Sequence, residues 1–146
     1  MKTLFVMRGI QGSGKSFLAK SLVKNGQIFS ADDYFSIEGK YNWTIEKLSD
    51  AHKWNSKRVF QAIKSNISPI VIDNTNITLK DLRRLKNIIV EAQKNNYNIE
   101  IVETDTPWRF DVDELCKRNI HNVPRETIKN KVREYVKDVK LKDILN

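Results

Sequence analysis

Short apolar runs alternate with longer segments of helical spacing along this chain. The apolar runs have the length of buried strands and cover residues 4–7, 27–30, 70–72 and 98–103. Apolar residues at helical spacing predict helices over residues 15–25, 44–66, 78–96, 111–119 and 125–139. Thr78, with Asp81 three residues on, is the expected N-cap of the third of these helices, as in a capping box. Strands that alternate with helices are typical of a parallel sheet covered on both faces. The expected fold class is therefore α/β, with three layers (α/β/α) built around a small parallel sheet.

The first apolar run leads directly into a glycine-rich segment, the glycine loop (residues 9–16). Its sequence Gly-Ile-Gln-Gly-Ser-Gly-Lys-Ser fits G-x-x-x-x-G-K-[ST] at every fixed position, and a predicted helix follows. In this context the motif predicts a P-loop NTPase, in which backbone N–H groups and the helix dipole hold a polyphosphate. Lys15 is expected to reach the β- and γ-phosphates as a catalytic residue, and the Ser16 hydroxyl to hold Mg²⁺. The predicted nucleotide-binding residues are Gly9, Gln11, Gly12, Ser13, Gly14, Lys15 and Ser16.

Polar side chains follow the second and third predicted strands, where ligands bind in sheets of this kind. An Asp32 carboxylate near the γ-phosphate can accept the proton of an attacking hydroxyl or hold Mg²⁺ through water, whereas acidic pairs in loops are often only solvated. Asp73 ends the third strand, where phosphate-loop proteins place a second acid that organises Mg²⁺, and it can also start an Asx-turn. Further substrate contacts are expected from neighbouring polar side chains, namely Asp33, Asn74, Thr75 and Asn76.

The predicted helix 44–66 carries two polar residues on its apolar face. His52 and Asn55 lie on the same side as the apolar positions Ile45 and Val59, whereas Trp54 points away. Polar groups within an apolar face need hydrogen-bond partners if they are buried. We favour a structural pair that ties this helix to a loop at the edge of the sheet. The alternative places His52 in the substrate cleft.

The last third of the chain is rich in basic residues. A charge run on a helix is most often its solvated face, and the lysines of the final predicted helix can lie opposite an inward stripe that includes Ile128 and Val132. Arg118 is different because phosphoryl transfer needs positive charge beside the developing charge of the phosphate. We therefore predict a C-terminal helical lid (about residues 107–125) that carries Arg118 as a catalytic residue.

Length and composition set broader limits. A chain of 146 residues is expected to form a single domain, residues 1–146. No apolar run approaches the ~20 residues of a membrane span, the first residues do not resemble a signal peptide, and Cys116 is the only cysteine. These features predict a cytoplasmic protein without a membrane partner. The net charge of +8 favours a polyanionic partner such as nucleic acid, although AT-rich coding can also enrich lysine.

Several of these segments together resemble the polynucleotide 5′-kinase family of small phosphate-loop kinases. The likeness spans nearly the whole chain in order, and the branch it resembles includes bacteriophage 5′-kinase domains and the kinase-like domain of certain ubiquitin-ligase-binding proteins. The segments are the glycine loop, Phe-Ser-Ala-Asp-Asp-Tyr-Phe at 29–35, Ala-His-Lys-Trp-Asn at 51–55, Ile-Asp-Asn-Thr-Asn at 72–76, Thr-Pro-Trp at 106–108, and Lys-Arg-Asn at 117–119 followed by Val-Pro at 123–124.

The resemblance implies transfer of the γ-phosphate of ATP, with Mg²⁺, to a 5′-hydroxyl of DNA or RNA. Asp32 would match the general base of the family. Thr75 and its neighbours would face the acceptor nucleotide, and Arg118 would match an arginine on the lid that stabilises the transferring phosphate.

This chain also departs from the bacteriophage pattern at the acceptor side. Phe35 stands where those kinases carry an arginine that contacts the acceptor phosphate, and the lid is shorter, with Ile-His-Asn at 120–122 in place of a second arginine. Arg125 is the candidate substitute and a predicted substrate contact, although it does not occupy the matching position. A small-molecule or nucleoside kinase, and a nucleotide-dependent binding module, therefore stay open as alternatives.

Overall fold

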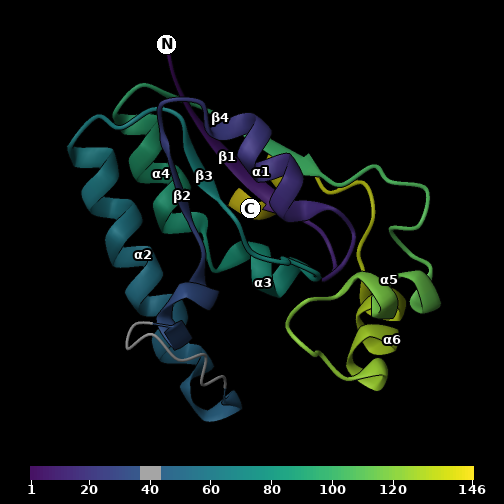
Figure 1. Cartoon of the computed structure of the whole chain (residues 1–146). Coiled ribbons are helices and arrows are strands. Elements are labelled where there is room, and N and C mark those ends of the chain that lie inside the picture. Colours follow the sequence, from purple (N-terminus) through teal and green to yellow (C-terminus); the bar gives the residue numbers. More distant parts are fainter. Residues whose placement is uncertain (37–43) are drawn as a thin grey trace.

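A parallel β-sheet forms the centre of the molecule (Figure 1). The computed structural model describes residues 1–36 and 44–146. Within those ranges the sheet has four strands in the order β2-β3-β1-β4, namely β1 (Lys2–Arg8), β2 (Gln27–Phe29), β3 (Ile70–Ile72) and β4 (Tyr97–Glu103). All neighbouring strands are parallel, with Leu4 of β1 opposite Ile70 on one side and Ile99 on the other. The predicted α/β class with a small parallel sheet is confirmed.

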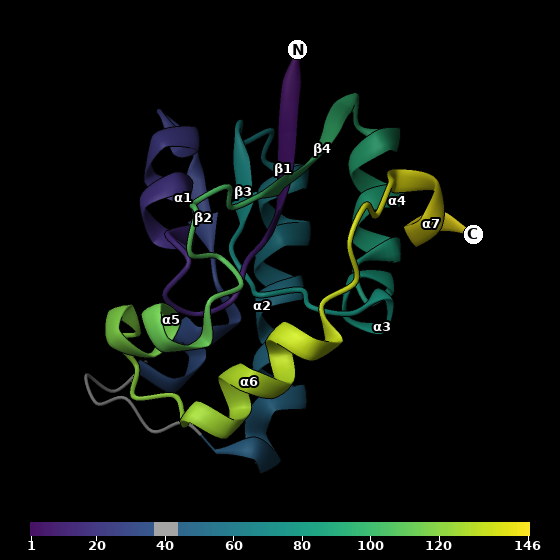
Figure 2. The same ribbon diagram turned by 90° about the vertical axis from the view of Figure 1, so that its right-hand side faces the viewer.

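Helices cover both faces of the sheet, as Figure 2 shows from the side. The helices of the two faces are α1 (Lys15–Val23) on one side, and α2 (Leu48–Lys64), α3 (Leu79–Arg83), α4 (Lys86–Lys94) and α7 (Leu141–Leu145) on the other. Successive side chains of a strand point to opposite faces. Accordingly, Leu4 and Val6 pack beneath α2 and α4, whereas Phe5 and Met7 pack beneath α1. The predicted three layers are therefore present.

Two further helices lie beyond the carboxyl ends of the strands (Figure 1). These are α5 (Val112–Arg118) and α6 (Arg125–Glu134). They share a small separate core with the segments that follow β1 and β3, built on Ile10, Ile77, Leu115 and Ile128. Within the described ranges no helix is long and apolar enough to cross a membrane.

Some expected boundaries are corrected. The predicted helix 78–96 is divided into α3 and α4, although its predicted capping box is confirmed: Thr78 Oγ1 accepts from the Asp81 amide, and Asp81 Oδ2 accepts from the Thr78 amide, both at 3.2 Å. The predicted helix 125–139 stops at Glu134, and α7 follows. Ile45 was expected on the apolar face of its helix, but its side chain is 68% exposed in the short 3₁₀ turn that precedes α2.

Candidate active site

The glycine loop joins the end of β1 to α1 in a conformation that requires glycine at two positions. Gly12 and Gly14 have φ angles of +88° and +97°. A Cβ atom at Gly12 would also lie 2.5 Å from the backbone oxygen of Leu115 in α5. No side chain of the described residues caps the start of α1, and its first turn holds no acidic residue. The helix dipole and the first N–H groups of α1 thus suit an anion.

Residues of the segment that follows β4 form hydrogen bonds to the glycine loop. Trp108 Nε1 donates to the Gly12 carbonyl oxygen at 3.0 Å, and Thr106 Oγ1 donates to the Ser13 carbonyl oxygen at 2.8 Å. The Ser13 side chain is fully buried and accepts from Thr104 Oγ1 at 3.1 Å. Because its hydroxyl has this structural role, Ser13 has only its backbone left to offer a nucleotide, which refines the sequence prediction.

Lys15 forms a close ion pair with Asp73 at the end of β3. Its Nζ lies 2.6 Å from Asp73 Oδ1, and the two side chains are only 16% and 12% exposed. Gln11 and Ser16 line the same cleft, and Gln11 Oε1 is buried without a hydrogen-bond partner in the described part of the chain. Two elements that are 58 residues apart in sequence thus meet at the motif lysine.

The oxygen donors at this point fit Mg²⁺. Ser16 and Asp73 both line the cleft and offer a hydroxyl and a carboxylate, the hard donors that Mg²⁺ prefers. No group of three or more His, Cys, Asp or Glu side chains among residues 1–36 and 44–146 could hold a metal by itself. Mg²⁺ at this site would therefore depend on nucleotide phosphates for further ligands, as is usual for this ion.

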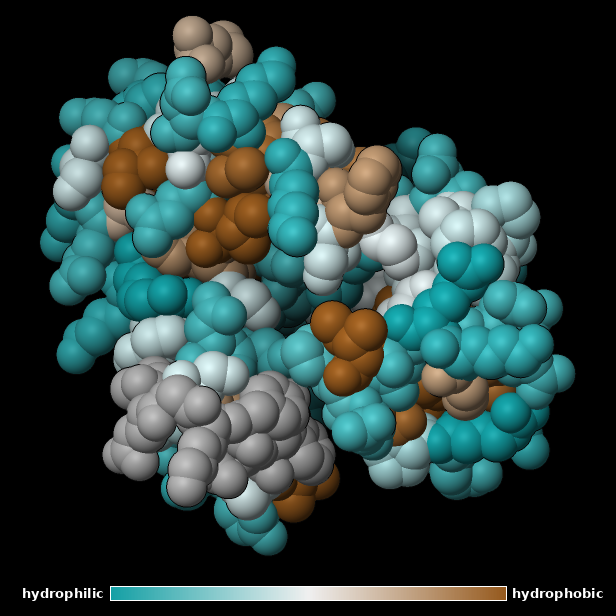
Figure 3. Space-filling model, in the orientation of Figure 1, coloured by the Kyte–Doolittle hydropathy of each residue, from teal (hydrophilic) through white to brown (hydrophobic). Residues whose placement is uncertain are grey.

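A cleft with a volume of about 1450 Å³ separates the sheet from α5 and α6. Figure 3 shows the surface hollowed between the main body and the part on the right that carries these two helices. Lys15, Asp32, Asp33, Asp73 and Arg118 all line this cleft. The structure thus brings the three predicted catalytic residues and the predicted metal ligand Asp73 into one cavity.

Asp32 lies in a 3₁₀ helix, η1 (Ala31–Ser36), that follows β2. The position of η1 is fixed by Asn74, whose Oδ1 accepts from the Ala31 amide at 3.0 Å. Asp32 Oδ2 lies 3.5 Å from Nε2 of His121, and Asp33 Oδ2 pairs with Arg58 at 3.4 Å. The predicted base is therefore in contact with the predicted lid.

The cleft is also lined by Asn74, Thr75 and Asn76, which make different hydrogen bonds. The Thr75 carbonyl oxygen accepts from the Gly9 amide at 3.0 Å. Asn76 is 4% exposed, has φ of +48°, and donates from Nδ2 to the Met7 carbonyl oxygen at 2.8 Å. The Asn76 amide thus joins the loop after β3 to β1, and contact between Asn76 and substrate stays a prediction.

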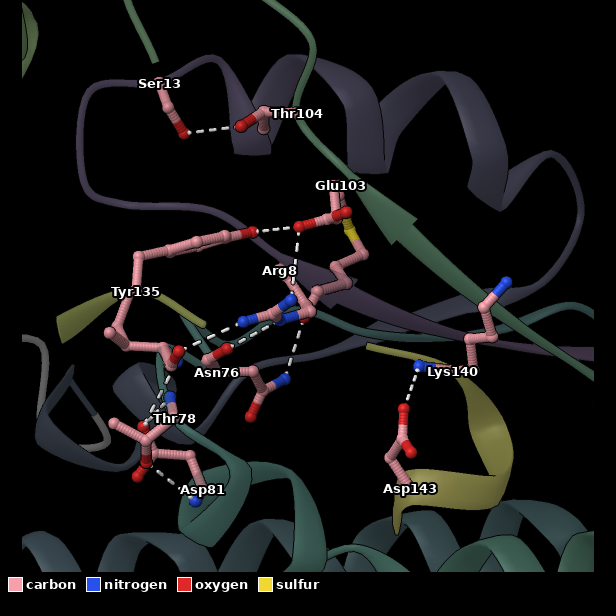
Figure 4. Close-up of polar contacts among 12 residues, drawn as sticks. Arg8, Ser13, Asn76, Thr78, Asp81, Glu103, Thr104, Tyr135, Lys140 and Asp143 are labelled. Carbon is pink, nitrogen blue, oxygen red and sulfur yellow. Dashed lines mark hydrogen bonds and ion pairs between the residues drawn. The ribbon is translucent and has the colours of Figure 1, made fainter. Parts of the chain in front are cut away.

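Arg8, at the carboxyl end of β1, fixes the same loop (Figure 4). Its fully buried guanidinium donates from Nε to the Asn76 carbonyl oxygen at 2.9 Å and from Nη2 to the Ile77 carbonyl oxygen at 3.0 Å. Nη1 pairs with Glu103 at 3.2 Å, and the guanidinium lies 4.3 Å from the centre of the Tyr135 ring. A buried charge is tolerated when it is paired and hydrogen-bonded, so Arg8 can anchor this wall of the cleft.

Of the two predicted lid arginines, only Arg118 lines the cleft. Its guanidinium lies 3.7 Å from the centre of the Trp108 ring, and its Nε bonds to Glu114 at 3.3 Å. Arg125 forms an ion pair with Asp113 and does not line the cleft, so the prediction that it contacts substrate is corrected. This pairing lowers the pKa of Asp113 through a hydrogen bond and the charge of Arg125.

The interpretation that we favoured for His52 and Asn55 holds for only one of them. Asn55 is buried, donates to the Phe29 carbonyl oxygen at 3.4 Å and accepts from Arg58 at 2.8 Å, so it is structural. His52 lines the cleft instead. Burial, with the positive charge of Arg84, lowers the pKa of His52 from 6.5 to about 4, against a smaller opposite effect of Asp81.

Comparison with protein-family models shows which family this chain belongs to. The family model described as AAA domain (AAA_33) matches residues 4–139. The chain belongs to the AAA domain family. The resemblance found in the sequence is thereby confirmed at the level of a P-loop kinase domain.

Curated relatives of this AAA domain are larger proteins. NEDD4-binding protein 2 of Homo sapiens is 40% identical over an alignment of 146 positions, which covers 98% of this chain and 8% of that protein. The 2′,3′-cyclic-nucleotide 3′-phosphodiesterase of Rattus norvegicus is 34% identical over an alignment of 122 positions, which covers 81% of this chain and 27% of that protein. The chain thus spans less than a third of either relative.

Solved structures share the fold of this AAA domain. A chain of the Pnkp1/Rnl/Hen1 RNA repair complex superposes with a TM-score of 0.68 at 21% identity, over 91% of this chain and 43% of that chain. A sugar kinase from Janibacter sp. HTCC2649 superposes with a TM-score of 0.64 at 15% identity, over 97% and 81% of the two chains. The fold is therefore that of a P-loop kinase, and it occurs with more than one kind of function.

Proposed function

We propose that this domain is an ATP-dependent phosphotransferase that moves the γ-phosphate of ATP to a 5′-hydroxyl of DNA or RNA. One observation carries the proposal: the carboxylate of Asp32 lines the same cleft as Lys15 and the start of α1, although the two residues follow different strands. A proton acceptor and a phosphate-binding cation in one cavity are what hydroxyl phosphorylation needs.

The donor side of the cleft is built from the glycine loop. Backbone N–H groups of the loop and the start of α1 would hold the phosphates, with Lys15 Nζ against the β- and γ-oxygens. When bound, Mg²⁺ would neutralise part of the phosphate charge, held by the Ser16 hydroxyl and Asp73. Arg118, connected to the glycine loop through Trp108, supplies positive charge from the lid.

The acceptor side centres on Asp32. The oxygen of the 5′-hydroxyl forms a bond to the γ-phosphorus while the bond from that phosphorus to the bridging β–γ oxygen breaks, and ADP leaves. The hydroxyl proton passes to the Asp32 carboxylate. Since His121 contacts this carboxylate at 3.5 Å, the contact has to open for the hydroxyl to reach Oδ2.

A specific observation favours a second candidate, a small-molecule or nucleoside kinase. Phe35 is 5% exposed and packs in a small apolar cluster with Ala31 and Ala51, so this position cannot offer a cation to an acceptor phosphate. A sugar kinase with the same fold fits this reading. The phosphodiesterase relative does not by itself suggest hydrolysis here, because this chain covers 27% of that protein.

The test measures transfer from γ-labelled ATP to four acceptors: a 5′-hydroxyl DNA oligonucleotide, the matching RNA, a nucleoside and a simple sugar. Asp32→Asn should lower transfer by about 10²- to 10⁴-fold and leave ATP affinity within about two-fold, because general base catalysis is worth this much. Asp50→Asn is the matched control, since Asp50 is exposed on α2 and does not line the cleft.

Each alternative has its own outcome in this test. Transfer to the nucleoside or sugar but not to either oligonucleotide would select the small-molecule kinase. Tight ATP binding without transfer to any acceptor would select the nucleotide-dependent binding module. Undiminished transfer by Asp32→Asn would remove Asp32 from the role of base.

A further inference from the structure

Lys131 enters the active-site cleft from α6, where the sequence suggested a solvated face. One face of this helix packs Ile128 and Val132 into the small core behind the lid. The adjacent face turns Thr127, Lys131 and Glu134 into the wall of the cleft, at positions i, i+4 and i+7. Lys131 therefore shares a cavity with the glycine loop, although it is more than one hundred residues away in sequence.

This lysine differs from the other cations of the described cleft lining because no described residue pairs with it. Lys15 pairs with Asp73 at 2.6 Å, Arg84 with Asp81 at 3.6 Å, and Arg118 with Glu114 at 3.3 Å. In the part of the chain that the structure describes, no acceptor takes a hydrogen bond from the ammonium of Lys131 and no carboxylate forms an ion pair with it. A partly buried charge without a partner is costly, and an anionic ligand would offset that cost.

The electrostatic surroundings place Lys131 near the reacting groups. Burial lowers the pKa of Lys131, the positive charge of Lys15 lowers it further, and the charges of Asp81 and Asp32 raise it. The ammonium is thus close enough to sense both the phosphate-binding lysine and the predicted base. The fall in pKa shows that its partial burial and the neighbouring cation are not fully balanced by the two carboxylates.

Asp32 marks the acceptor side of this cavity in the proposed function, so Lys131 stands where an acceptor would need a cation. Phe35 is buried and cannot supply this charge, and Arg125 is turned away to Asp113. Lys131 is the cation of the described cleft lining that remains without a protein partner, because the other three are paired.

We propose that Lys131 binds a phosphate group of the acceptor, adjacent to the sugar whose 5′-hydroxyl is phosphorylated, so that the cleft selects a phosphate-bearing acceptor over a free nucleoside. The proposal rests on the proposed function, because it assigns this cation to the acceptor of that reaction. An acceptor with its own phosphate is a nucleotide or the end of a nucleic acid, whereas a sugar or a nucleoside lacks the group.

The experiment measures binding, which does not require turnover. Isothermal titration calorimetry compares adenosine 3′-monophosphate with adenosine, after the glycine loop has been saturated with Mg²⁺ and a non-hydrolysable ATP analogue. The variants are Lys131→Gln and Lys131→Met, which remove the charge, and Lys131→Arg, which keeps it. Lys129→Gln is the matched control, because Lys129 is an exposed lysine of the same helix that does not line the cleft.

The native chain should bind the 3′-monophosphate at least about ten-fold more tightly than adenosine, as expected for one charge-assisted contact. Lys131→Gln and Lys131→Met should bind both ligands alike, whereas Lys131→Arg and Lys129→Gln should keep the preference. A preference that survives both uncharged variants overturns the proposal. So does a native chain that binds both ligands equally, or a loss confined to the ATP analogue.

The two proposals fail separately. If no acceptor is phosphorylated but the preference depends on Lys131, the transferase proposal falls and the anion site stands. If 5′-hydroxyl ends are phosphorylated but Lys131→Gln keeps the native preference for the 3′-monophosphate, the transferase proposal stands and Lys131 has no part in acceptor selection.

Discussion

Nε2 of His121 lies 3.5 Å from Oδ2 of Asp32, and this contact joins the segment that follows α5 to η1 across the cleft. Asp32 follows β2 and His121 follows α5, so the pair spans the opening between the body and the lid. A hydroxyl that donates its proton to Asp32 needs the same region of the carboxylate. Under the proposed function, an acceptor would have to displace this contact before its hydroxyl could reach Oδ2 of Asp32.

Under the proposed function, removing the His121 side chain should ease acceptor binding, because Asp32, the proposed base, stays in place. His121→Ala is expected to lower KM for the acceptor by up to about five-fold and to change kcat by less than about three-fold, because a partly exposed contact of this kind contributes at most about 1 kcal/mol. Steady-state kinetics with a 5′-hydroxyl oligonucleotide measures both constants. Glu126→Ala serves as control, because Glu126 is exposed on α6 and does not line the cleft. A loss of kcat greater than 100-fold would instead make His121 a catalytic group.

Gly12 connects the glycine loop to the lid by close backbone approach. Gly12→Ala should destabilise the fold more than Gly14→Ala, because both residues have positive φ but only at Gly12 would the new Cβ meet a backbone oxygen, that of Leu115, at 2.5 Å. We expect a loss of about 1–3 kcal/mol for the strained backbone, with a further loss from displacement of α5. Urea unfolding of both variants measures the difference. Equal losses would show that α5 moves aside at no cost.

Features set by short stretches of sequence could be predicted, whereas features set by contacts between distant segments could not. Local patterns predicted the glycine loop, the capping box at Thr78 and the alternation of strands with helices. The position of Lys131 was not predicted, because which face of α6 lines the cleft depends on how that helix crosses the small core. The pairing of Arg125 with Asp113 on α5 could not be predicted for the same reason, because it depends on how α5 and α6 pack together.

Helix α6 also shows how tertiary contacts override periodicity. The apolar spacing continues beyond Glu134, but Tyr135 takes an extended conformation and the Val136 amide donates to the Ile77 carbonyl oxygen at 3.1 Å. The Tyr135 hydroxyl meets Glu103, the same carboxylate that pairs with Arg8. A single-sequence pattern cannot anticipate such bonds, because their partners lie at the end of β4 and after β3.

Arg8 should be among the least replaceable residues outside the glycine loop. Arg8→Lys keeps the charge but loses the forked donors that reach the carbonyl oxygens of Asn76 and Ile77, leaving buried acceptors without partners. We expect a loss of about 2–4 kcal/mol in the free energy of unfolding, measured by urea denaturation. Arg83→Lys, at an exposed arginine with one bond to the Asp143 carbonyl oxygen, should change it by less than about 0.5 kcal/mol. Similar values for the two variants would contradict the anchoring role of Arg8.

His52 should make the fold sensitive to mild acid. Because its pKa is about 4 in the folded chain against 6.5 ordinarily, the unfolded chain binds more protons between these values. The stabilisation from a neutral His52 is complete above pH 6.5 and is lost as the pH falls towards 4. Allowing for partial exposure of the side chain, we expect this to remove about 1–2 kcal/mol.

Urea unfolding at pH 7.5, 5.5 and 4.5 isolates this contribution when the native chain is compared with His52→Gln. The variant should lose less stability than the native chain between pH 7.5 and pH 4.5, since glutamine does not titrate. Lys53→Gln is the matched control, because Lys53 is the exposed neighbour of His52 on α2 and does not line the cleft, and it should keep the native pH dependence. Identical pH profiles for the native chain and His52→Gln would mean that His52 is protonated at no cost within the folded cleft.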